Sequence, residues 1–600
     1  MFIRRAKTRT ADTGEVYYSH RLVRNERQGG KVRQRTLLNL GSEFPVGRAH
    51  WPLLCARIDQ LLEGQDGLVP LTCPPEVEQQ AQHVAAQLLN QRPPAAGGEP
   101  DLHTVDVDTL ELVRPRSVGV EAVGLWAAEQ LGLDALLERL GLSRTQRALA
   151  LATIVGRMAK PGSERATWHW LCERSALGEL LDVDFWRMSP MSLYRISDAL
   201  LVHRGAIESH LFDRATDLFG LSRTVTLYDL TNTYFEGKAQ AQHKARRGHS
   251  KEKRTDCPLL TLGLVLDGSG FVRRSEVFSG SVNEDTTLAP MLEALRAPAD
   301  ALVVMDAGVA TEDNVAWLRE NGYRYLVVSR ERTRRFDPDL ATALETRSRQ
   351  TVQVQKVEDD EGGETRLYCY SEARAEKERG IVERFRMRLE GELTKLHEGL
   401  SRPRTRKGLD HVWQRIGRIR ENSRGAGAHY VIDVVPDDTG TRARAVTWER
   451  KPRDGTMHTH PGVYCLRTNV RDWDEETLWR TYTTLTDVEA VFRSLKSELG
   501  LRPIFHHTQK RSDGHLFISV IAYQMVQTIR RQLAGQGGTD SWKTLRSVLE
   551  GQQRVTATFR RKDGRTLHVR KATRTEPPQE EIYRILGADP APGGVRKMVV

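Results

Sequence analysis

The spacing of hydrophobic residues changes several times along the chain, and each change marks a predicted module boundary. Residues 1–42 are predicted to be β-rich, because the alternating stretch EVYYSHRLV (15–23) and the run KVRQRTLLNLG (31–41) flank an RQGG turn. From 118 to 220 the apolar residues recur at helical spacing, as in VEAVGLWAAEQLGLDALLERLGL. The intervening stretch RPPAAGGEP (92–100) has the composition of a linker.

A strand-like pattern begins at residue 223. The apolar runs that predict strands are TVTLYDLTNTYF (224–235), LLTLGLVLDGSGFVRRSEVFSG (259–280), ALVVMDAGVA (301–310) and YRYLVVSR (323–330). Between the last two lies TEDNVAWLRENG, which reads as a helix with a Thr cap and a Gly stop. We therefore expect strands and a helix arranged on a mixed sheet.

The next segment, 335–466, interrupts this pattern. It holds two predicted hairpins, and between them an amphipathic helix whose apolar stripe is Ile381, Phe385, Leu389, Leu393, Leu396 and Leu400. A strongly helical stretch follows, EETLWRTYTTLTDVEAVFRSLKSELG (475–500). We interpret 335–466 as an insertion that splits one α/β domain in sequence but not in space.

The predicted division has seven parts. They are a basic β-rich module (1–50), a helix and linker (51–117), a helical block (118–222), the first part of an α/β domain (223–334), the insertion (335–466), the second part of the domain (467–545) and a C-terminal hairpin and helix (546–600).

Composition narrows the class of partner. The formal net charge of +11 favours an anionic partner such as nucleic acid, although many Arg-rich proteins are mildly basic without one. The six cysteines form no C-x-x-C pair, which argues against a disulfide framework and a zinc finger. No apolar run approaches the length of a membrane span, and MFIRRAKTRT has no apolar leader core. We expect a soluble protein of a reducing cytoplasm, with no membrane partner.

Two aspartates stand in apolar strand surroundings. Asp229 interrupts the strand LYDLT, and Asp306 ends the strand ALVVMD. A carboxylate held against a sheet is costly unless it is compensated. A hard cation such as Mg²⁺ compensates it, since Mg²⁺ takes oxygen ligands and often lies between carboxylates and a phosphate. The alternative is that each Asp caps a turn or pairs with an Arg.

A third acid lies in the helical stretch YTTLTDVEAVFRSLK. Tyr482, Glu489 and Lys496 are each seven residues apart, so a helix places them on nearly the same face. Arg493 shares that face, four residues after Glu489. An acid among a tyrosine and two cations fits a metal ligand beside a phosphate backbone. An exposed helix with an ordinary Glu–Arg pair is the alternative.

Together these motifs resemble those of DDE-class insertion-sequence transposases. The order of strand Asp, strand-end Asp and helical Glu is similar to the subgroup with a Tyr-Arg-Glu-Lys signature and an insertion before the last acid. The matching stretches are YDLTNTYFEG, GHSKEKRTDCPLLTLGLVLDGSGFVRRSEVFSGSVNEDTT, VVMDAGVATEDN, YTTLTDVEAVFRSLK and the N-terminal GGKVRQRTLLNLG, so the resemblance covers most of the chain. One position departs: Leu485 stands where the signature has Arg, and Arg480 and Arg493 are the candidates to replace its charge.

The resemblance implies an α/β fold whose RNase H-like catalytic domain is split by a mixed α+β insertion and preceded by β-rich and all-helical DNA-binding modules. It implies that Asp229, Asp306 and Glu489 hold two Mg²⁺ ions, for which Mn²⁺ can substitute, and that these ions drive DNA cleavage and strand transfer. The expected partners are terminal inverted repeats, target DNA and a second copy of the chain in a synaptic complex. The expected location is the prokaryotic nucleoid. For the helical block, a packing role is the alternative to DNA binding.

Weaker signals concern DNA contacts. The basic run KARRGHSKEKR contains Lys251, Lys253 and Arg254, which contact phosphates or form a solvated loop. Trp448 is the candidate aromatic of the insertion that would hold a flipped base, and core packing is its alternative.

A histidine-rich stretch follows the helix of the third acid. It contains His506, His507, Arg511 and His515, but neither cysteines nor tight spacing support a zinc site there.

Two other functions remain open from sequence alone. A metal-dependent nuclease such as a junction resolvase would use the same fold, but a long N-terminal half and an insertion fit a compact resolvase less well. A DNA-end-binding protein from a decayed element would bind without cutting, and the three intact acids argue against it.

Overall fold

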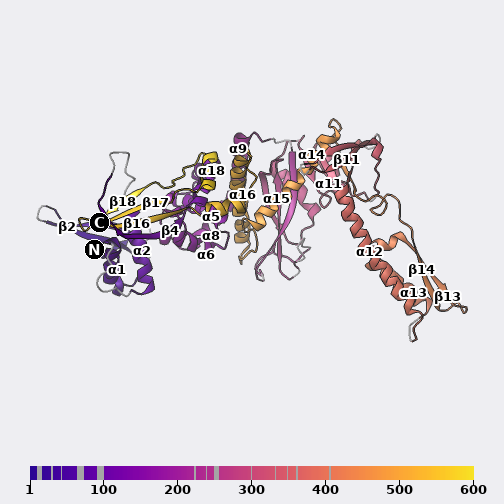
Figure 1. Ribbon diagram of the computed structural model, residues 1–600, viewed down its shortest axis with the longest axis horizontal. Helices are drawn as coiled ribbons and strands as arrows, with labels where there is room; N and C mark the ends of the chain where they lie inside the picture. Colours follow the sequence, from indigo (N-terminus) through magenta and orange to yellow (C-terminus); the bar gives the residue numbers. More distant parts are fainter. Residues whose placement is uncertain are drawn as a thin grey trace.

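The computed structural model describes most of the chain. The described residues are 1–9, 16–28, 31–41, 44–63, 73–90, 101–221, 225–237, 239–248, 254, 256–298, 300–331, 333–346, 349–359, 363–403 and 407–600. The molecule is elongated, with the N-terminal module and both termini at one end and a long arm at the other (Figure 1).

The N-terminal module is a small sheet packed on two helices. Strands β1 (Phe2–Arg9), β2 (Val16–Gln28) and β3 (Lys31–Gly41) are antiparallel in the order β1-β2-β3. After a short 3-10 turn η1 (Arg48–His50), helices α1 (Trp51–Glu63) and α2 (Pro75–Asn90) cover one face of the sheet. The shared core includes Leu22, Leu54, Ile58 and Val84, all almost fully buried. The module therefore has its own hydrophobic core.

A second sheet joins distant parts of the chain. Its order is β18-β17-β16-β4, formed by β4 (Val105–Ser117), β16 (Gln553–Arg561), β17 (Thr566–Ala572) and β18 (Arg596–Val599). Strand β4 lies in the segment that the sequence predicted as helix and linker. Most of its side chains are exposed, and it is the backbone pairing with β16 that orders it.

The helical block forms as expected from its periodicity. Its elements are α3 (Gly119–Gln130), α4 (Leu133–Arg139), α5 (Arg144–Ala159), α6 (Glu164–Glu173), α7 (Leu177–Leu180), η2 (Phe185–Arg187), α8 (Met191–Val202) and α9 (Arg204–Phe219). A capping box of Ser143 and Gln146 starts α5, and Gly220 with φ 62° ends α9. The block packs against α16 (Gln509–Ala534), a long and mostly buried helix.

A nine-stranded sheet lies beyond α16. Its first five strands are β5 (Val225–Tyr234), β6 (Leu259–Leu266), β7 (Val272–Ser279), β8 (Leu302–Met305) and β9 (Arg324–Val328). They lie in the order β7-β6-β5-β8-β9, with β5, β8 and β9 parallel and β6 and β7 antiparallel. The connections between them contain η3 (Glu284–Thr287), α10 (Leu288–Leu295) and α11 (Glu312–Glu320), and Thr311 caps α11 as predicted.

Part of the expected insertion extends this sheet. Past the short turn η4 (Pro338–Leu340), strands β10 (Thr342–Glu345), β11 (Thr351–Asp359) and β12 (Glu364–Ser371) pair in sequence, and β15 (Val463–Thr468) joins β12 to β9. The segment 335–466 is therefore only partly separate from the α/β domain. Strand β15 covers the edge of β9, which would otherwise expose unpaired backbone groups.

The rest of the segment projects as an arm. It consists of α12 (Glu372–Gly399), α13 (Leu409–Asn422), η5 (Ala426–His429) and the hairpin β13 (Tyr430–Pro436) and β14 (Ala443–Arg450), seen at the lower right of Figure 1. Leu389, Leu393 and Leu396 of the predicted stripe are buried against α13 and the hairpin, in a core separate from that of the sheet.

The helical stretch after β15 is divided in two. Helices α14 (Glu475–Thr483) and α15 (Leu485–Ser497) meet at Thr484, and the chain continues into α16. Near the C-terminus, α17 (Trp542–Leu549) and α18 (Pro577–Leu586) pack on the helical block and α16. Among the helices of the described residues, none is both long and apolar enough to cross a bilayer.

Candidate active site

Asp229 and Asp306 lie on neighbouring parallel strands at the same edge of the sheet. Tyr228 of β5 pairs with Met305 of β8, so the next residue along each strand is an aspartate. Adjacent strands are separated by about 4.8 Å, which makes the two carboxylates neighbours. Asp229 is half-buried, and its Oδ1 accepts the Leu230 N–H at 2.7 Å.

A tight turn holds Asp306. Its Oδ1 accepts the backbone N–H of Gly308 at 2.9 Å and of Val309 at 3.4 Å. The Arg330 guanidinium donates to the carbonyls of Ala307 and Gly308, each at 2.6 Å, and so clamps the turn from the other side. The position of the Asp306 carboxylate is thus set by backbone contacts.

Glu489 enters the site from α15. Val488, Val491, Phe492 and Leu495 are buried against the core and fix the rotation of the helix. Glu489 lies outside this apolar face and is exposed. The amphipathic pattern of α15 therefore decides which way its acid points.

The three acids line one cavity of about 420 Å³. Its lining residues are Asp229, Leu230, Thr231, Asp306, Tyr482, Leu485, Glu489, Phe492, Arg493, Lys496, Ser497 and Arg502. Folding thus brings the predicted acids to one site, together with Tyr482, Arg493 and Lys496. Their carboxylates line the cavity but are not all within 4.8 Å of one another. Among the described residues, only Glu164, His506 and His515 form a group of three possible metal ligands that close together.

The negative charges of the cavity affect the pKa of Tyr482. Burial raises the pKa of its hydroxyl, and the carboxylates of Asp306 and Glu489 raise it further. The Tyr482 ring lies 6.2 Å from that of Tyr464. A hydroxyl that stays protonated beside two carboxylates is suited to donate a hydrogen bond in the site.

The cavity clarifies the departure at position 485. Leu485 lines the cavity and packs on the core, so an apolar side chain occupies that position. Arg493 reaches the cavity, whereas Arg480 donates to Glu476 at 2.7 Å and is not among the lining residues. Arg502 also lines the cavity, and the sequence analysis missed it because it lies in a loop with no helical spacing to the acids.

The basic run near the first acid is only partly described. Arg254 forms a two-pronged pair with Asp256, at 2.7 and 2.8 Å, and its guanidinium lies 4.4 Å from the centre of the Tyr234 ring. Arg502 approaches the same ring at 5.8 Å. Lys251 and Lys253 lie outside the described residues.

Trp448 lies in the arm and not at the cavity. It is half-buried, pairs with Ile432 across the β13–β14 hairpin and packs on the arm core, with its ring 6.4 Å from that of His397. This is the core packing that the sequence analysis kept as an alternative. A base-holding role for Trp448 stays a prediction, and this packing does not favour it.

Two of the predicted histidines join an acid from the helical block. The Glu164 carboxylate lies 3.1 Å from His506 Nε2 and 3.6 Å from His515 Nδ1, and Arg157 donates to that same Nδ1 at 3.1 Å. Burial and the Arg157 charge lower the pKa of His515 to about 4. The buried guanidinium already neutralises Glu164, so an added cation would meet Arg157 at close range. The group acts as a polar link between α5, α6 and α16.

The other two residues of that stretch do not join the group. His507 is exposed, and Arg511 pairs with Asp198 at 2.9 Å. Sequence spacing could not reveal Glu164, which precedes His506 by more than half the chain length.

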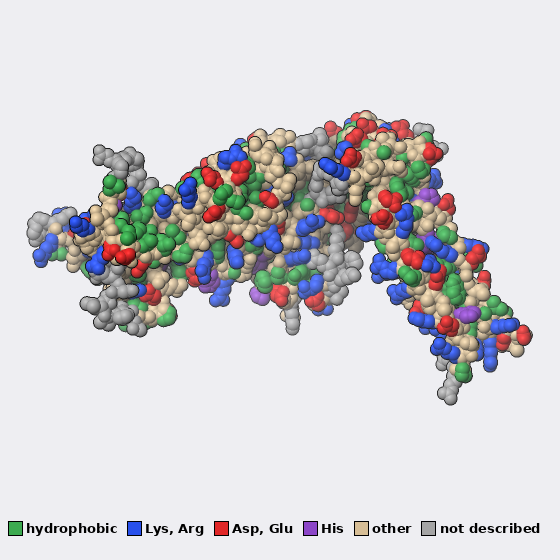
Figure 2. Space-filling model, viewed as in Figure 1, with side chains coloured by type: hydrophobic (Ala, Val, Ile, Leu, Met, Phe, Trp, Pro, Cys, Tyr) green, Lys and Arg blue, Asp and Glu red, His purple; other side chains and the backbone are tan. Residues whose placement is uncertain are grey.

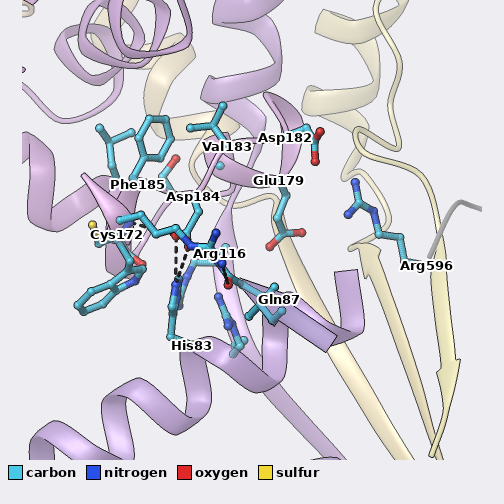
Figure 3. Close-up of a pocket in the computed structure, with 17 residues that line it drawn as sticks. His83, Gln87, Arg116, Cys172, Glu179, Asp182, Val183, Asp184, Phe185 and Arg596 are labelled. Carbon is cyan, nitrogen blue, oxygen red and sulfur yellow. Dashed lines mark hydrogen bonds and ion pairs between the residues drawn. The ribbon is translucent and has the colours of Figure 1, made fainter. Parts of the chain in front are cut away.

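A second cavity, of about 340 Å³, lies between α2, β4 and the segment around η2 (Figure 3). Asp184 dominates its centre and contacts His83, Gln87 and Arg187. Arg114 and Arg116 also line it, and within the described part of the chain neither forms an ion pair with a carboxylate.

Arg114 and Arg116 lie at an irregularity in the pairing of β4 with β16. Arg114 has φ 54°, and the pairing with β16 shifts register between Val113 and Arg116. Burial lowers the pKa of Arg114 to about 9, and the charges of Arg116 and Arg570 lower it too. The cavity therefore holds arginine and carboxylate side chains together, since Glu179, Asp182 and Asp184 line it as well.

Comparison with known proteins gives two matches to family models. A family described as "Transposase DDE domain" matches residues 220–525, about half of the chain, and one described as "IS1634 family transposase, N-terminal domain" matches residues 3–67. No curated protein matches the sequence.

Proposed function

Since the chain belongs to the DDE transposase family and is a DNA transposase, we propose that Asp229, Asp306 and Glu489 are its catalytic acids. The observation that carries the proposal is their convergence on one cavity from two strands and a helix. The matched segment 220–525 contains all three residues. The proposed reaction is cleavage at the ends of the element followed by transfer of the 3′-ends to target DNA.

The strand arrangement supports an RNase H-like catalytic core. Strands β5, β8 and β9 are parallel, β6 and β7 continue the sheet as antiparallel neighbours, and the two aspartates follow one another across β5 and β8. Helix α15 then adds Glu489 from beyond the insertion. In this proposal 223–334 and 467–545 form the core, and the arm is its insertion.

The donor set fits divalent metal ions, which the DDE family generally uses. All three proposed ligands are carboxylates, the class that hard cations prefer, and their rigid mounts suit a site that must hold its geometry. We propose two Mg²⁺ ions, replaceable by Mn²⁺. When bound, such ions activate a water or a 3′-hydroxyl and stabilise the leaving oxygen.

The remaining lining residues position the DNA. Arg493, Lys496 and Arg502 place positive charge along one side of the cavity, where a scissile strand would carry its phosphates. Tyr482 keeps its proton and can donate to a phosphate oxygen. These contacts orient the strand relative to the acids, which is the main task of a protein in phosphoryl transfer.

The N-terminal half is the proposed reader of the terminal inverted repeats. The second cavity, with Arg114 and Arg116, lies where the N-terminal module meets the helical block. Lys and Arg side chains also lie along the arm formed by α12 and α13, shown in blue among the red Asp and Glu side chains in Figure 2. Lys and Arg side chains at both ends of an elongated molecule support binding of DNA on each side of the catalytic cavity, with two copies of the chain joining two ends.

Cleavage of a duplex that carries the element end tests the proposal. With Mg²⁺, the wild-type chain should cut the end and join it to a target duplex, while Asp229→Asn, Asp306→Asn and Glu489→Gln should each reduce cutting by at least about a thousandfold, or about 4 kcal/mol. The matched control is Asp217→Asn, an exposed acid of α9 paired with Arg214, which should leave the rate unchanged.

The outcomes separate the alternatives. Cutting without joining would indicate a nuclease, and binding without either step would indicate an end-binding protein. Full activity of the three acid variants would refute the site assignment.

A further inference from the structure

The three strands of the N-terminal sheet carry charge of almost one sign. Strands β1, β2 and β3 contain ten Lys and Arg residues and a single acid, Glu26. The sheet lies at the end of the elongated molecule away from the arm, and Figure 2 shows Lys and Arg side chains at that end. A surface with this charge attracts a polyanion.

The sheet has two faces, which its hydrophobic core distinguishes. Helices α1 and α2 cover the inner face, where Leu22 and Leu38 are buried in the core of the module. Successive side chains of a strand point to opposite faces, and residues paired across two strands share a face. The outer face, turned away from the helices, therefore carries the exposed side chains of Arg4, Arg21, Asn25, Arg27 and Gln34.

Acidic partners of the arginines lie on the inner face. Arg24 and Arg35 are opposite each other there, and each has an acid beside it. Arg24 pairs with Asp59 of α1 at 3.4 Å, and Arg35 pairs with Glu26 at 3.2 Å. Among the described residues of the three strands, the outer face holds no Asp or Glu. The positive charge of the outer face is therefore left without acids on its own strands.

Two arginines of the outer face are direct cross-strand neighbours. Arg4 of β1 lies opposite Arg21 of β2. Like charges directly opposite each other, with Cβ atoms about 5 Å apart, destabilise a sheet. Within the described part of the chain, neither arginine forms an ion pair with a carboxylate. A bound anion would relieve this repulsion, as Asp59 and Glu26 do for the inner pair.

The far half of β2 and β3 is a two-stranded ribbon. Its pairing extends to Gln28 and Lys31. The side chains of residues 32–36 are exposed on both faces, so no other described part of the chain covers the ribbon there. A two-stranded ribbon fits the major groove of B-DNA, which is about 12 Å wide and displays a distinct pattern of donors and acceptors for each base pair.

The outer face of the ribbon has the residue types that read bases. Asn25 lies directly opposite Gln34, and Arg27 follows two positions after Asn25 on the same face. Asn and Gln form paired hydrogen bonds with adenine, and Arg does so with guanine. Arg4 donates to Gln34 Oε1 at 3.1 Å, which fixes the orientation of that amide on the outer face.

We propose that the outer face of the N-terminal sheet binds duplex DNA, with the β2–β3 ribbon in the major groove. Asn25, Arg27 and Gln34 then contact base edges, while Arg4 and Arg21 contact the phosphates beside the groove. The inference rests on the proposed function, because the duplex is the terminal inverted repeat of the element. It assigns base recognition to one face of one sheet within the N-terminal half.

Fluorescence anisotropy of the full chain in EDTA measures this binding without cleavage. Two duplexes of equal length are compared, one with the element end and one with its sequence scrambled. Asn25→Ala should weaken binding to the end at least tenfold and leave binding to the scrambled duplex unchanged, because a base contact carries sequence information. Arg21→Gln should weaken binding to both duplexes and lower the slope of log K against log salt by about 0.9, because it removes a phosphate contact.

Arg35→Gln is the matched control. It removes the same charge from the inner face of the same ribbon, so both affinities and the salt slope should equal those of the wild type. The side chains at positions 21, 25 and 35 are exposed, so each variant should keep the Tm of the wild type. An equal loss of affinity in Arg35→Gln and Arg21→Gln would show a general attraction of charge and overturn the assignment to the outer face.

Methylation interference tests the choice of groove. A methyl group on guanine N7 projects into the major groove, so it should block binding of the wild type at one or more guanines of the end. Arg27→Gln should lose its sensitivity to methylation at one of these guanines. Binding that tolerates N7 methylation at every guanine would overturn the placement of the ribbon in the major groove.

The failure of this inference differs from that of the proposed function. Wild-type binding of both duplexes by Asn25→Ala and Arg21→Gln would overturn the inference, while cutting that depends on Asp229, Asp306 and Glu489 would still support the catalytic assignment. Full cutting by the three acid variants would reject the catalytic assignment and leave the binding measurements in EDTA unaffected.

Discussion

At the scale of single residues, the structure separates two arginines, Arg480 and Arg493, that sequence spacing could not tell apart. Arg480 and Arg493 both lie near Glu489 in the sequence, and either could have replaced the signature Arg at Leu485. Of these two, Arg493 lines the cavity, whereas Arg480 pairs with Glu476 one turn away on the exposed side of α14. We therefore expect Arg493, four residues after Glu489, to supply the charge that the signature places at position 485.

A salt titration of DNA binding tests this assignment. Arg493→Gln should lower the slope of log K against log salt by about 0.9 for a duplex end, because one phosphate contact is lost. Arg480→Gln is its matched control and should leave the slope unchanged. Equal slopes for Arg493→Gln and the wild type, measured by fluorescence anisotropy in EDTA, would remove Arg493 from the DNA contacts.

The residues of the cavity also show how much of the candidate site could be predicted from the sequence. Asp229, Asp306 and Glu489 stood out because each is an acid in an apolar or amphipathic context, and all three reach the cavity. Arg502 carried no such signal, since it lies in a connection where no periodicity constrains a side chain. Trp448 carried a signal, a strand aromatic, that packing in the arm accounts for.

At the scale of elements, the polar group of Glu164, His506 and His515 ties the helical block to the catalytic half. His515 lies on α16, Glu164 begins α6, and His506 follows the segment that pairs with the end of β5 through Ile504. The loop from α15 to α16 is therefore anchored at both ends. Its position helps to set where Glu489 and Arg502 lie.

This group predicts a pH dependence of stability. The pKa of His515 is lowered to about 4 in the folded chain, so between about pH 6.5 and 4 the unfolded chain binds more protons than the folded one. Stability should therefore fall as the pH falls through that window, by up to about 3 kcal/mol from this residue. Hydrogen exchange of α16 amides measures the effect.

His515→Gln is the variant for comparison. It should remove most of this slope while lowering stability at neutral pH, because Arg157 and Glu164 lose a partner. His507→Gln, at an exposed position in the same stretch, should keep the slope. An unchanged slope in His515→Gln would assign the acid sensitivity to other groups.

At the scale of the whole molecule, the arm is a separable unit attached to the edge of the catalytic sheet. Its core of α12, α13 and the β13–β14 hairpin is distinct from the core that supports the acids. At its base, the Gly462 N–H donates to Glu378 at 2.8 Å, so the outgoing and returning chains lie together. We therefore expect that the arm can be removed without opening the sheet.

A chain in which residues 379–461 are replaced by a short Gly-Ser linker should keep the catalytic core. We expect its Mn²⁺ binding to match that of the wild type and its affinity for a duplex end to fall at least tenfold, because the Lys and Arg side chains of the arm are gone. Titration and anisotropy measure the two properties. Loss of Mn²⁺ binding in this chain would show that the arm supports the metal site itself.

Local sequence indicated the types of most elements and the three candidate acids, Asp229, Asp306 and Glu489. Periodicity, the Thr311 cap and the Gly220 stop act between residues a few positions apart, so they are readable without a structure. Only the tertiary structure decided that β4 pairs with β16 and that Glu164 meets His515. These contacts depend on sheet register and on the packing of distant segments. A local sequence pattern cannot predict how close two side chains lie when hundreds of residues separate them in the chain.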